Sequence, residues 1–193
     1  MSIFRPIVLS VIIVSLANTA GAQDFEKGLR ALRAGTFAAA LAELRPLAEN
    51  GHGGAQYLLG TMFEYGRGVS QDDGAAVIWY RSAAENDIAF AQYRLGVLFD
   101  NGWGVDEDRA SAVRWYKLAA EQGHLLAQHD LALMYFSGQG VEKNPVLAIM
   151  WMKIAVDAGD ERMVKHYALI ASAMSKAEID EGIALAQKWR KRR

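Results

Sequence analysis

The sequence contains no cysteine among its 193 residues. This absence excludes disulfide bonds, thiolate zinc sites and cysteine nucleophiles. No strong excess of charge is present either, because 21 Lys and Arg residues stand against 22 Asp and Glu residues. We therefore expect one elongated domain whose parts are held together by packing alone.

Residue patterns that carry catalysis or bind ions are also missing. The glycine pairs of the chain lack the third glycine and the preceding strand of a dinucleotide-binding fingerprint. Asp106-Glu107-Asp108 lacks the ligand spacing of an EF-hand loop. No serine lies in a nucleophile elbow or in a Ser-x-x-Lys pattern. We expect no catalytic residue, no metal and no cofactor, and hence a protein that is not an enzyme.

What the sequence does contain is a pattern that recurs every 36 residues. The motif Ala-Gln-x-x-Leu-Gly begins at Ala55 and Ala91, and it returns at Ala127 with Ala132 in place of the glycine. A Gly-x-Gly-Val motif and a tryptophan follow in the same register: Gly66, Gly68, Val69 and Trp79; Gly102, Gly104, Val105 and Trp115; Gly138, Gly140, Val141 and Trp151. A fixed period of this size indicates stacked supersecondary units.

Each unit is predicted to form two helices. In the second helix, small and aromatic residues at i, i+3, i+4, i+7 and i+8 make one apolar face. Asp72, Asp108 and Asn144 precede these helices and suit the N-cap position. The glycine pairs lie where the first helix must end. We expect the recurring tryptophans to form the core, and the central Trp115 to be the residue whose truncation costs most stability.

At these motifs the chain resembles a known family. The order Ala-Gln-x-x-Leu-Gly, Gly-x-Gly-Val and Ala-x-x-Trp-Tyr-x-x-Ala-Ala-Glu is similar to the Sel-one-like repeat, a relative of the tetratricopeptide repeat. The resemblance implies an all-α fold, a right-handed α-α superhelix or solenoid of about five helical hairpins. Several members of that family are cysteine-rich, and this chain departs from them in having no cysteine.

The chain is predicted to have four parts. Residues 1–22 read as a cleaved signal peptide, residues 23–53 as a degenerate capping hairpin, residues 54–160 as three repeats, and residues 161–193 as a C-terminal capping hairpin with a basic tail. The last helix is expected to open with a capping box at Ser175-Lys176-Ala177-Glu178.

The signal peptide is predicted from the first 22 residues. Arg5 gives a positive start, an apolar run follows, and Ala20-Gly21-Ala22 forms a cleavage site. The apolar run is too short for a membrane-spanning anchor. We expect the protein in the periplasm or secreted, after cleavage near Ala22.

The tail is basic at five of its six positions, from Lys188 to Arg193. Cations at this place complement the dipole of a helix C-terminus, and we prefer that interpretation to contact with a membrane or a wall polymer. Nucleic acid is not an expected partner, because the rest of the exported chain is acidic.

Binding residues are expected on the first helices, which line the concave groove in tetratricopeptide-like arrays. The predicted groove residues are Tyr57, Thr61 and Glu64, then Tyr93, Val97 and Asp100, then His129, Leu133 and Phe136. Trp103 lies between two glycines, where it would be either a lid on the stack or an exposed anchor.

The four histidines are not expected to form a site. His52 and His124 lie two periods apart. His129 and His166 differ by 37 residues rather than 36, so we expect them to point in different directions. A zinc site needs three or four converging ligands, and a solvated or groove-lining role is preferred.

The resemblance implies a periplasmic or secreted scaffold or regulator, without catalysis, that binds a protein or peptide in the groove. The alternative is a cell-wall-associated enzyme or a protein that binds peptidoglycan or β-lactams. That alternative comes from cysteine-rich relatives, and this sequence lacks the residue sets that it would need.

Overall fold

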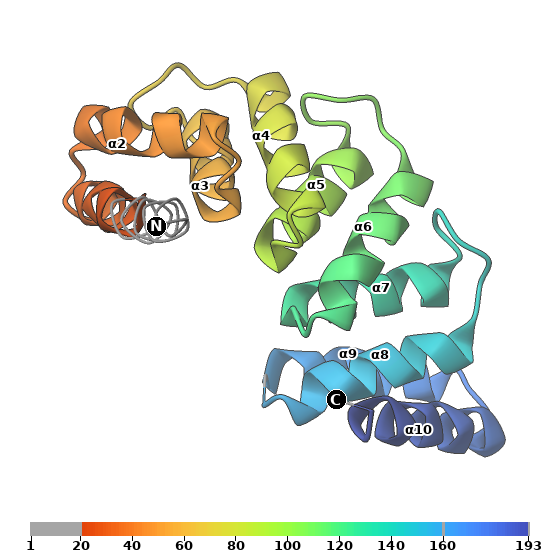
Figure 1. Cartoon of the computed structure of the whole chain (residues 1–193). Helices are drawn as coiled ribbons and strands as arrows, with labels where there is room; N and C mark the ends of the chain where they lie inside the picture. Colours follow the sequence, from red (N-terminus) through yellow and green to blue (C-terminus); the bar gives the residue numbers. More distant parts are fainter. Residues whose placement is uncertain (1–20, 160, 193) are drawn as a thin grey trace, which may run out of the picture. The chain divides into compact units, whose positions relative to one another are not determined.

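The computed structural model describes residues 21–159 and 161–192, and it is helical throughout (Figure 1). Residues 21–33 are helical. The helices that follow are α2 (Phe37–Glu49), α3 (Gly53–Glu64), α4 (Asp73–Glu85), α5 (Ala89–Asn101), α6 (Arg109–Glu121), α7 (Leu125–Ser137), α8 (Pro145–Asp157), α9 (Glu161–Ser172) and α10 (Lys176–Arg190). No strand occurs in these described ranges. The fold class is an all-α solenoid, as expected.

The helices fall into two compact units, which divide after Ser82 within α4. In the first unit, α2 packs against α3. Their buried faces form a core of Ala40, Leu44, Ala48, Ala55, Leu59 and Met62, and the half-buried ring of Phe25 packs against it. Both helices therefore contribute alanines and larger side chains to this core.

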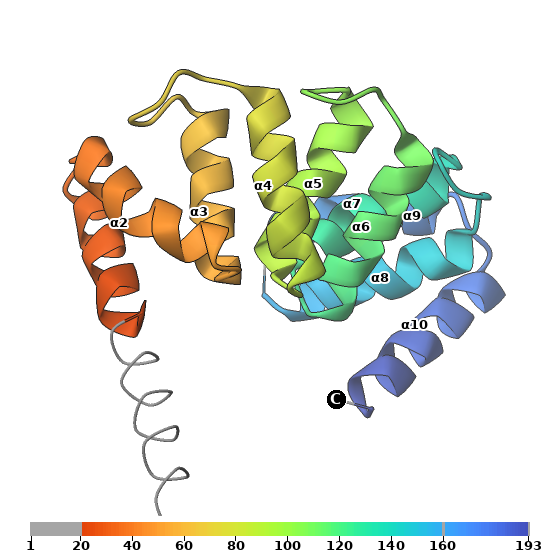
Figure 2. The same ribbon diagram turned by 45° about the horizontal axis from the view of Figure 1, so that its top comes forward.

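The second unit continues the hairpin pattern from α5 to α10 (Figures 1 and 2). Each helix from α5 to α8 packs on the next one, and α8 also contacts both α9 and α10. The fully buried positions recur with the repeat period, for example Ala91 and Ala127, or Leu95 and Leu131. The period seen in the sequence is therefore the period of the core.

Side-chain caps begin most of these helices. Asp72 accepts a hydrogen bond from the backbone N–H of Ala75, Asp108 from that of Ser111, and Asn144 from that of Leu147. The three predicted N-caps are confirmed. The capping box at Ser175 and Glu178 is also confirmed, because each side chain binds the backbone N–H of the other residue.

The glycine pairs end the first helices as predicted. Gly102 and Gly138 are left-handed C-caps of α5 and α7, with φ of 69° and 76°. The second glycine of the last pair, Gly140, also has a positive φ of 69°. A Cβ atom there would clash with the backbone carbonyl of Arg109, at the start of α6. The loop after α7 therefore lies directly against the preceding repeat.

In the first two repeats, the tyrosine that follows the tryptophan is more buried than the tryptophan itself. Tyr80 is fully buried and Tyr116 nearly so, whereas Trp79 and Trp115 are only half-buried. Trp151 is the buried member of the tryptophan set, and the partly buried Trp79 packs against the core of the first unit. The expectation that all three form the core therefore holds fully only for Trp151, because Trp79 and Trp115 are partly buried. Trp79 and Trp115 each lie one residue before the tyrosine on the same helix, so their side chains point about 100° away from it.

The tyrosines fit against helix α3 or α5 because a glycine stands opposite. A Cβ atom at Gly60 would lie 2.6 Å from the Tyr80 ring, and one at Gly96 would lie 2.6 Å from the Tyr116 ring. In the third repeat both partners differ together: the fully buried Ala132 and Met152 occupy the equivalent positions. A flexible thioether side chain leaves room for the extra methyl group that a ring would not.

The predicted signal peptide falls on residues 1–20 and the start of the described chain, so its apolar run lies outside the described residues. Within the described part of the chain, no helix has the length and the apolar character needed to cross a membrane.

Candidate functional site

The first helices of the second unit bring several predicted binding residues together. We call the surface of α5, α7 and α9 that carries Tyr93, Val97, His129, Leu133 and Leu169 the first-helix face. Tyr93 and His129 hold equivalent repeat positions, and Val97 and Leu133 follow them one helical turn later. These four side chains are half-buried and so remain partly accessible.

Tyr93 is fixed by contacts on both sides. Its hydroxyl donates a hydrogen bond to Asp130 Oδ2 at 3.2 Å. Its ring stacks on the imidazole of His124, with the centroids 4.5 Å apart and the planes at 24°. Burial raises the pKa of Tyr93 above its usual value, and the negative charge and hydrogen bond of Asp130 raise it further. The Tyr93 hydroxyl is therefore a neutral donor at physiological pH.

Asp130 connects Tyr93 to a pair of histidines. While Oδ2 accepts from Tyr93, the other oxygen, Oδ1, lies 2.7 Å from His129 Nδ1. His129 Nε2 in turn lies 2.6 Å from Nδ1 of His166 on α9. The expectation that His129 and His166 point in different directions is therefore wrong.

The spacing of 37 residues is the reason that these side chains meet. Tyr93 and Asp130 are also 37 residues apart. Residues at equivalent positions on successive first helices point the same way and lie side by side. A residue one position further along is turned by about 100°, which directs its side chain toward the preceding helix.

The rings of His129 and His166 are within hydrogen-bond distance, and the tautomers decide which nitrogen donates. A neutral imidazole donates from one nitrogen and accepts at the other. If His129 donates from Nδ1 to Asp130, its Nε2 accepts from His166 Nδ1. The exposed His166 ring then keeps Nε2 as an acceptor for a ligand or for water. The arrangement offers hydrogen bonds at a fixed place.

Asp100 is less available than its sequence position suggests. Its carboxylate forms an ion pair with Arg109 Nε at 3.6 Å, and Arg109 Nη2 lies 3.2 Å from Glu107. Burial raises the pKa of Asp100, the charges of Asp130 and Glu107 add to this, and Arg109 opposes it. Asp100 is thus part of a local charge cluster.

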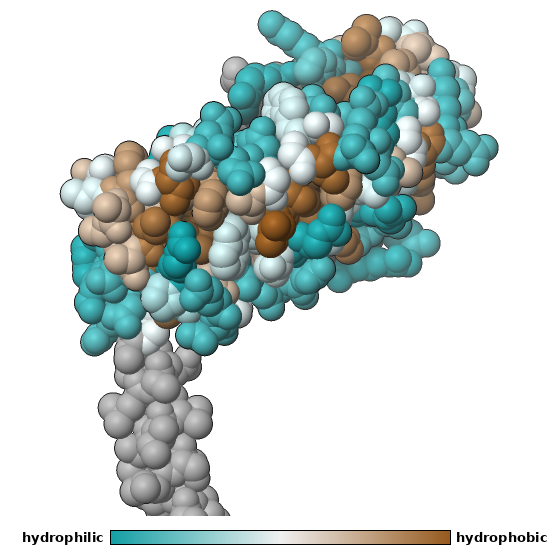
Figure 3. Space-filling view, turned by 90° about the horizontal axis from the view of Figure 1, so that it is seen from above, coloured by the Kyte–Doolittle hydropathy of each residue, from teal (hydrophilic) through white to brown (hydrophobic). Residues whose placement is uncertain are grey.

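Apolar side chains extend beyond the predicted residues. Leu169 follows Val97 and Leu133 at the same repeat position on α9, and 61% of it is exposed. Phe136 lies near the end of α7, where Lys143 Nζ is 5.6 Å from its ring centroid, a cation–π distance. Apolar side chains also remain exposed among hydrophilic ones on the face shown in Figure 3.

The predicted residues of the first repeat belong to the first unit. Glu64 is buried, and its carboxylate accepts a hydrogen bond of 2.6 Å from the Tyr80 hydroxyl. Tyr57 packs against the same Tyr80 ring at 5.8 Å, and the Thr61 hydroxyl donates to the Leu58 carbonyl at 2.7 Å. In this repeat the side chains of Glu64, Tyr57 and Thr61 all make contacts within the first unit.

Trp103 lies in the loop after α5, and its side chain is 50% exposed. Its backbone N–H donates to the Leu98 carbonyl at 3.0 Å, so the loop itself is held in place. This exposure is more typical of an anchor than of a lid on the stack.

Sequence reasoning did not find Asp130, His124 or His166 as members of the site. His124 also has a structural role, because its Nδ1 accepts from the backbone N–H of Ala127 and caps α7. His52 caps α3 in the same way. A search for residue pairs 37 apart would have pointed to Asp130 and His166. Among the residues that the structure describes, no group of three His, Asp or Glu side chains could hold a metal ion.

The basic tail is partly used within the fold. Arg190 Nη1 forms an ion pair of 2.7 Å with Asp157 at the end of α8, and Lys188 and Arg190 lie in the last turn of α10. This placement is consistent with the helix-dipole interpretation of the tail.

Three solved structures share this architecture. A Sel1 repeat protein from Oxalobacter formigenes is 31% identical, with a TM-score of 0.72 over 75% of this chain and 60% of that one. A protective antigen of uropathogenic Escherichia coli with an SLR fold is 30% identical, with a TM-score of 0.78 over 95% of this chain and 40% of that one. The chain thus spans less than two thirds of the length of either protein.

Helicobacter pylori cysteine rich protein B is 20% identical, with a TM-score of 0.51 over 64% of this chain and 93% of that one, which shows a likeness of fold. No curated protein matches the chain. The family model of the Sel1 repeat matches three consecutive segments, residues 53–88, 89–124 and 125–160, which together exceed half of the sequence. This chain belongs to the Sel1 repeat family.

Proposed function

We propose that this protein is an exported, non-catalytic scaffold or regulator that binds a segment of a partner protein on its first-helix face. Sel1 repeat proteins typically act as scaffolds for protein interactions. The hairpins over residues 23–53 and 161–193 would cap the three repeats at either end. Export rests on the predicted signal sequence, with cleavage near Ala22.

One observation carries this proposal: a partly exposed apolar row lies beside a fixed row of polar groups. Val97, Leu133 and Leu169 form the apolar row. Tyr93, Asp130 and the histidine pair are held by hydrogen bonds at a distance of one helical turn from it. Because these polar side chains are already ordered, binding would cost little conformational entropy of the site itself.

Apolar contacts would supply most of the affinity, and the polar row would set the position of the bound segment. Exposed apolar residues that gather on one face mark interaction sites more often than single ones do. Aromatic anchors such as Tyr93 and Phe136 commonly dominate the energy of such interfaces.

Site-specific crosslinking tests the proposal. A photoreactive amino acid would be placed at Leu169, or for comparison at Leu118, which is 43% exposed on the second helix α6. We expect a discrete adduct in intact cells from position 169, and its loss when Tyr93→Ala and Phe136→Ala are combined. Adducts that are equal at both positions, or that persist in the double variant, would contradict binding at this face.

Export is tested separately. Mass spectrometry of the protein from cell envelopes should give a mature chain that begins at Gln23. A full-length chain recovered from the cytoplasm would contradict export without affecting the proposed binding face.

A further inference from the structure

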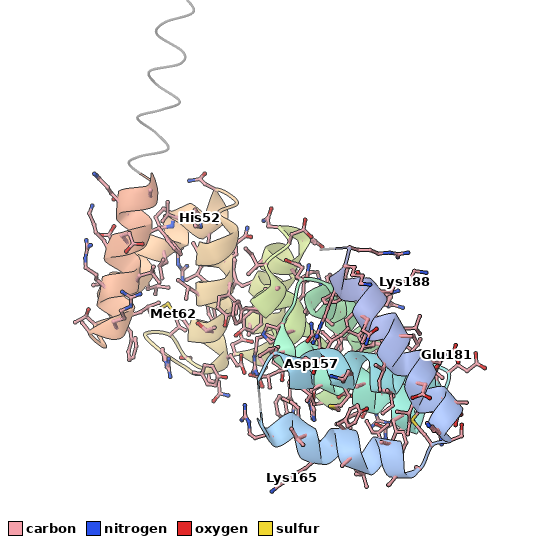
Figure 4. All side chains as sticks on the ribbon, turned by 90° about the horizontal axis from the view of Figure 1, so that it is seen from below. His52, Met62, Asp157, Lys165, Glu181 and Lys188 are labelled. Atoms are coloured by element: carbon pink, nitrogen blue, oxygen red, sulfur yellow. The ribbon has the colours of Figure 1, made fainter. Side chains whose placement is uncertain are left out.

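The last hairpin is arranged differently from the hairpins before it. In the second and third repeats the second helix packs along the first, α6 on α5 and α8 on α7. Helices α9 and α10 each pack on α8 instead, and they diverge from their shared turn (Figures 2 and 4). Their connecting loop is also shorter, because it consists of residues 173–175, whereas residues 102–108 and 138–144 connect the earlier pairs. Among the helices that the structure describes, none packs along α9 in the place that α6 or α8 takes.

One face of α9 is left open in this arrangement. We call the surface of Val164 and Ala168 the open α9 face. These residues hold the repeat positions of Gln128 and Ala132 on α7, which are buried. On α9, in contrast, Val164 is 50% exposed and Ala168 is exposed as well. The open α9 face is distinct from the first-helix face, because Leu169 is turned by about 100° from Ala168.

The earlier repeats show which side chain a second helix places opposite this position. Gly96 holds the position of Ala168 in the second repeat, and a Cβ atom there would lie 2.6 Å from the Tyr116 ring. In the third repeat Ala132 holds it, and the second helix carries Met152 in place of the tyrosine. Ala168 also has a Cβ atom. A flexible Met or Leu therefore fits opposite α9, whereas an aromatic ring would be crowded.

The residue one turn further along the first helix points to the same choice. In the first repeat this residue is Glu64, whose carboxylate accepts the hydrogen bond of the Tyr80 hydroxyl. In the third repeat it is Phe136, and Met152 has no hydroxyl to donate. Helix α9 has Ser172 at this position and thus no carboxylate. A tyrosine would lose its charged acceptor there, so α9 matches a second helix that carries an apolar side chain.

The charge beside the open α9 face distinguishes between two kinds of occupant. Lys165 is exposed on α9 (Figure 4) and holds the repeat position of Tyr93, whose ring lies 5.8 Å from that of Tyr116. A side chain placed opposite Ala168 would therefore lie near Lys165. Arg162 is a second exposed cation on α9. Two copies of this chain that met through α9 would bring these cations together, so a helix of different sequence fits better.

We propose that the open α9 face binds an amphipathic helix of a partner protein, which completes the last hairpin as α8 completes the third repeat. The face continues the row of first-helix positions that α6 and α8 cover in the preceding repeats. The partner helix places a Met or Leu side chain against Ala168, with small residues on either side that let the two helices approach closely. This is recognition of a helix through one apolar stripe. The site does not depend on the proposed function of the first-helix face.

Peptides with the sequence of α6 test the proposal, because this helix takes the equivalent place in the second repeat. The Met peptide comprises residues 108–122 with Tyr116→Met, and the Tyr peptide, with the natural sequence, is its matched control. Each would be titrated into the full mature chain and followed by methyl NMR. The signals of Val164 and Ala168 should shift and saturate with the Met peptide, with a dissociation constant of roughly 0.1–1 mM. The Tyr peptide should bind about fivefold more weakly or less, because its ring overpacks Ala168.

Substitutions on α9 sharpen the test. Ala168→Gly removes the Cβ atom, so the Tyr peptide should then bind at least as tightly as the Met peptide. Val164→Asp should abolish binding of both peptides, because it places a charge in the apolar contact. Leu169→Asp, at a similarly exposed position on the same helix, should bind them like the natural chain. Val164→Asp should also retain the crosslinked adduct from position 169, so the two proposals can fail separately.

Saturable binding of the Met peptide to a monomeric chain, with reversal of the preference in Ala168→Gly, would support the proposal. It is overturned if neither peptide shifts the signals of Val164 and Ala168, if the natural chain binds both equally well, or if Ala168→Gly leaves their ratio unchanged. Analytical ultracentrifugation gives the remaining outcome. A dimer that dissociates in Val164→Asp would assign the open α9 face to a second copy of this chain and would also overturn the proposal.

Discussion

The second and third repeats have the same helices but satisfy the same positions with different side chains. Gly96 faces Tyr116 in one, and Ala132 faces Met152 in the other. Gln92 Oε1 accepts a hydrogen bond from Gln122, whereas Ala158 holds the position of Gln122 one period later and Gln128 Oε1 has no hydrogen-bond partner among the described residues.

The beginnings of their first helices differ as well. Ile88 precedes α5 without a side-chain cap, and His124 precedes α7 and caps it. The differences teach that the backbone of a repeat tolerates exchange when both partners of a contact change together. Where only one partner changes, as at Ala158, an unsatisfied group remains.

The largest expected effect separates the tyrosine of the second repeat from its neighbouring tryptophan. Tyr116→Ala should lower the free energy of unfolding by about 3–5 kcal/mol, because it removes a nearly buried aromatic ring. Trp115→Ala should cost clearly less, since Trp115 is half-buried. Urea denaturation of both variants measures the difference. A larger loss for Trp115→Ala would restore the expectation made from sequence and contradict the packing described here.

A double-mutant cycle tests whether glycine and tyrosine form a matched pair. Gly96→Ala alone should cost about 1–3 kcal/mol, because the new methyl group overpacks the Tyr116 ring. In a Tyr116→Met background, which imitates the third repeat, the same change should cost less. We expect a coupling energy of about 1–2 kcal/mol between the two positions. Additive effects would show that the pair in the third repeat is unrelated to packing.

Alkaline pH should act through the tyrosine that follows the tryptophan in the first two repeats, a position that cannot ionise in the third. Burial is the main cause that raises the pKa values of Tyr80 and Tyr116, whereas the third repeat has Met152 at this position. The folded chain keeps these protons when the unfolded chain loses them. Stability is therefore complete below the unfolded pKa of about 10 and falls above it, by about 1.4 kcal/mol per pH unit for each tyrosine.

Urea melts of the natural chain and of Tyr116→Phe between about pH 9 and 11 measure this effect. The variant keeps the ring but cannot ionise, so its stability should fall less steeply. Equal slopes would mean that Tyr116 does not contribute.

Mild acid should give the smallest effect, through the cap that distinguishes the third repeat from the second. Burial lowers the pKa of His124, and the charge of Asp130 partly opposes this. Below the unfolded pKa of about 6.5, the unfolded chain binds a proton more readily than the folded chain. Stability is thus present above that pH and is lost as the pH falls through the folded value.

His124→Asn is the matched variant, because asparagine also caps a helix but does not titrate in this range. The difference in urea midpoint between the two proteins should grow as the pH is lowered from about 7 to about 5. A constant difference would exclude His124 as the titrating group.

The sequence was sufficient to predict the repeats, because the same residue types cap helices, end helices and fill the core every 36 positions. Asp72, Asp108 and Asn144 could be recognised as caps, since a cap acts within a few residues of its own helix. The tryptophans were overvalued because recurrence does not distinguish a fully buried residue from a half-buried one. The glycine of the preceding helix is part of the motif, but only the packing shows that it makes room for the tyrosine ring.

The candidate site could be predicted only in part. The groove positions were chosen by comparing equivalent residues, and this method finds Tyr93 and His129. The contacts that fix them join residues 37 apart, so Asp130 and His166 were missed. Whether a polar side chain is available to bind a partner also depends on tertiary contacts. The buried hydrogen bond between Tyr80 and Glu64 is an example, because it removes Glu64 from the binding surface.

The close approach of Gly140 to the backbone of Arg109 has a consequence for how such an array can change its specificity. Because the loop meets main-chain atoms, the separation of these two neighbouring repeats depends on the absence of a side chain at Gly140 and not on which residues cover the surface. Side chains on the first helices can therefore be exchanged without altering the spacing at which they are presented. A partner that matches this spacing would meet the same backbone geometry in every variant. Natural selection could then change binding specificity through the side chains alone.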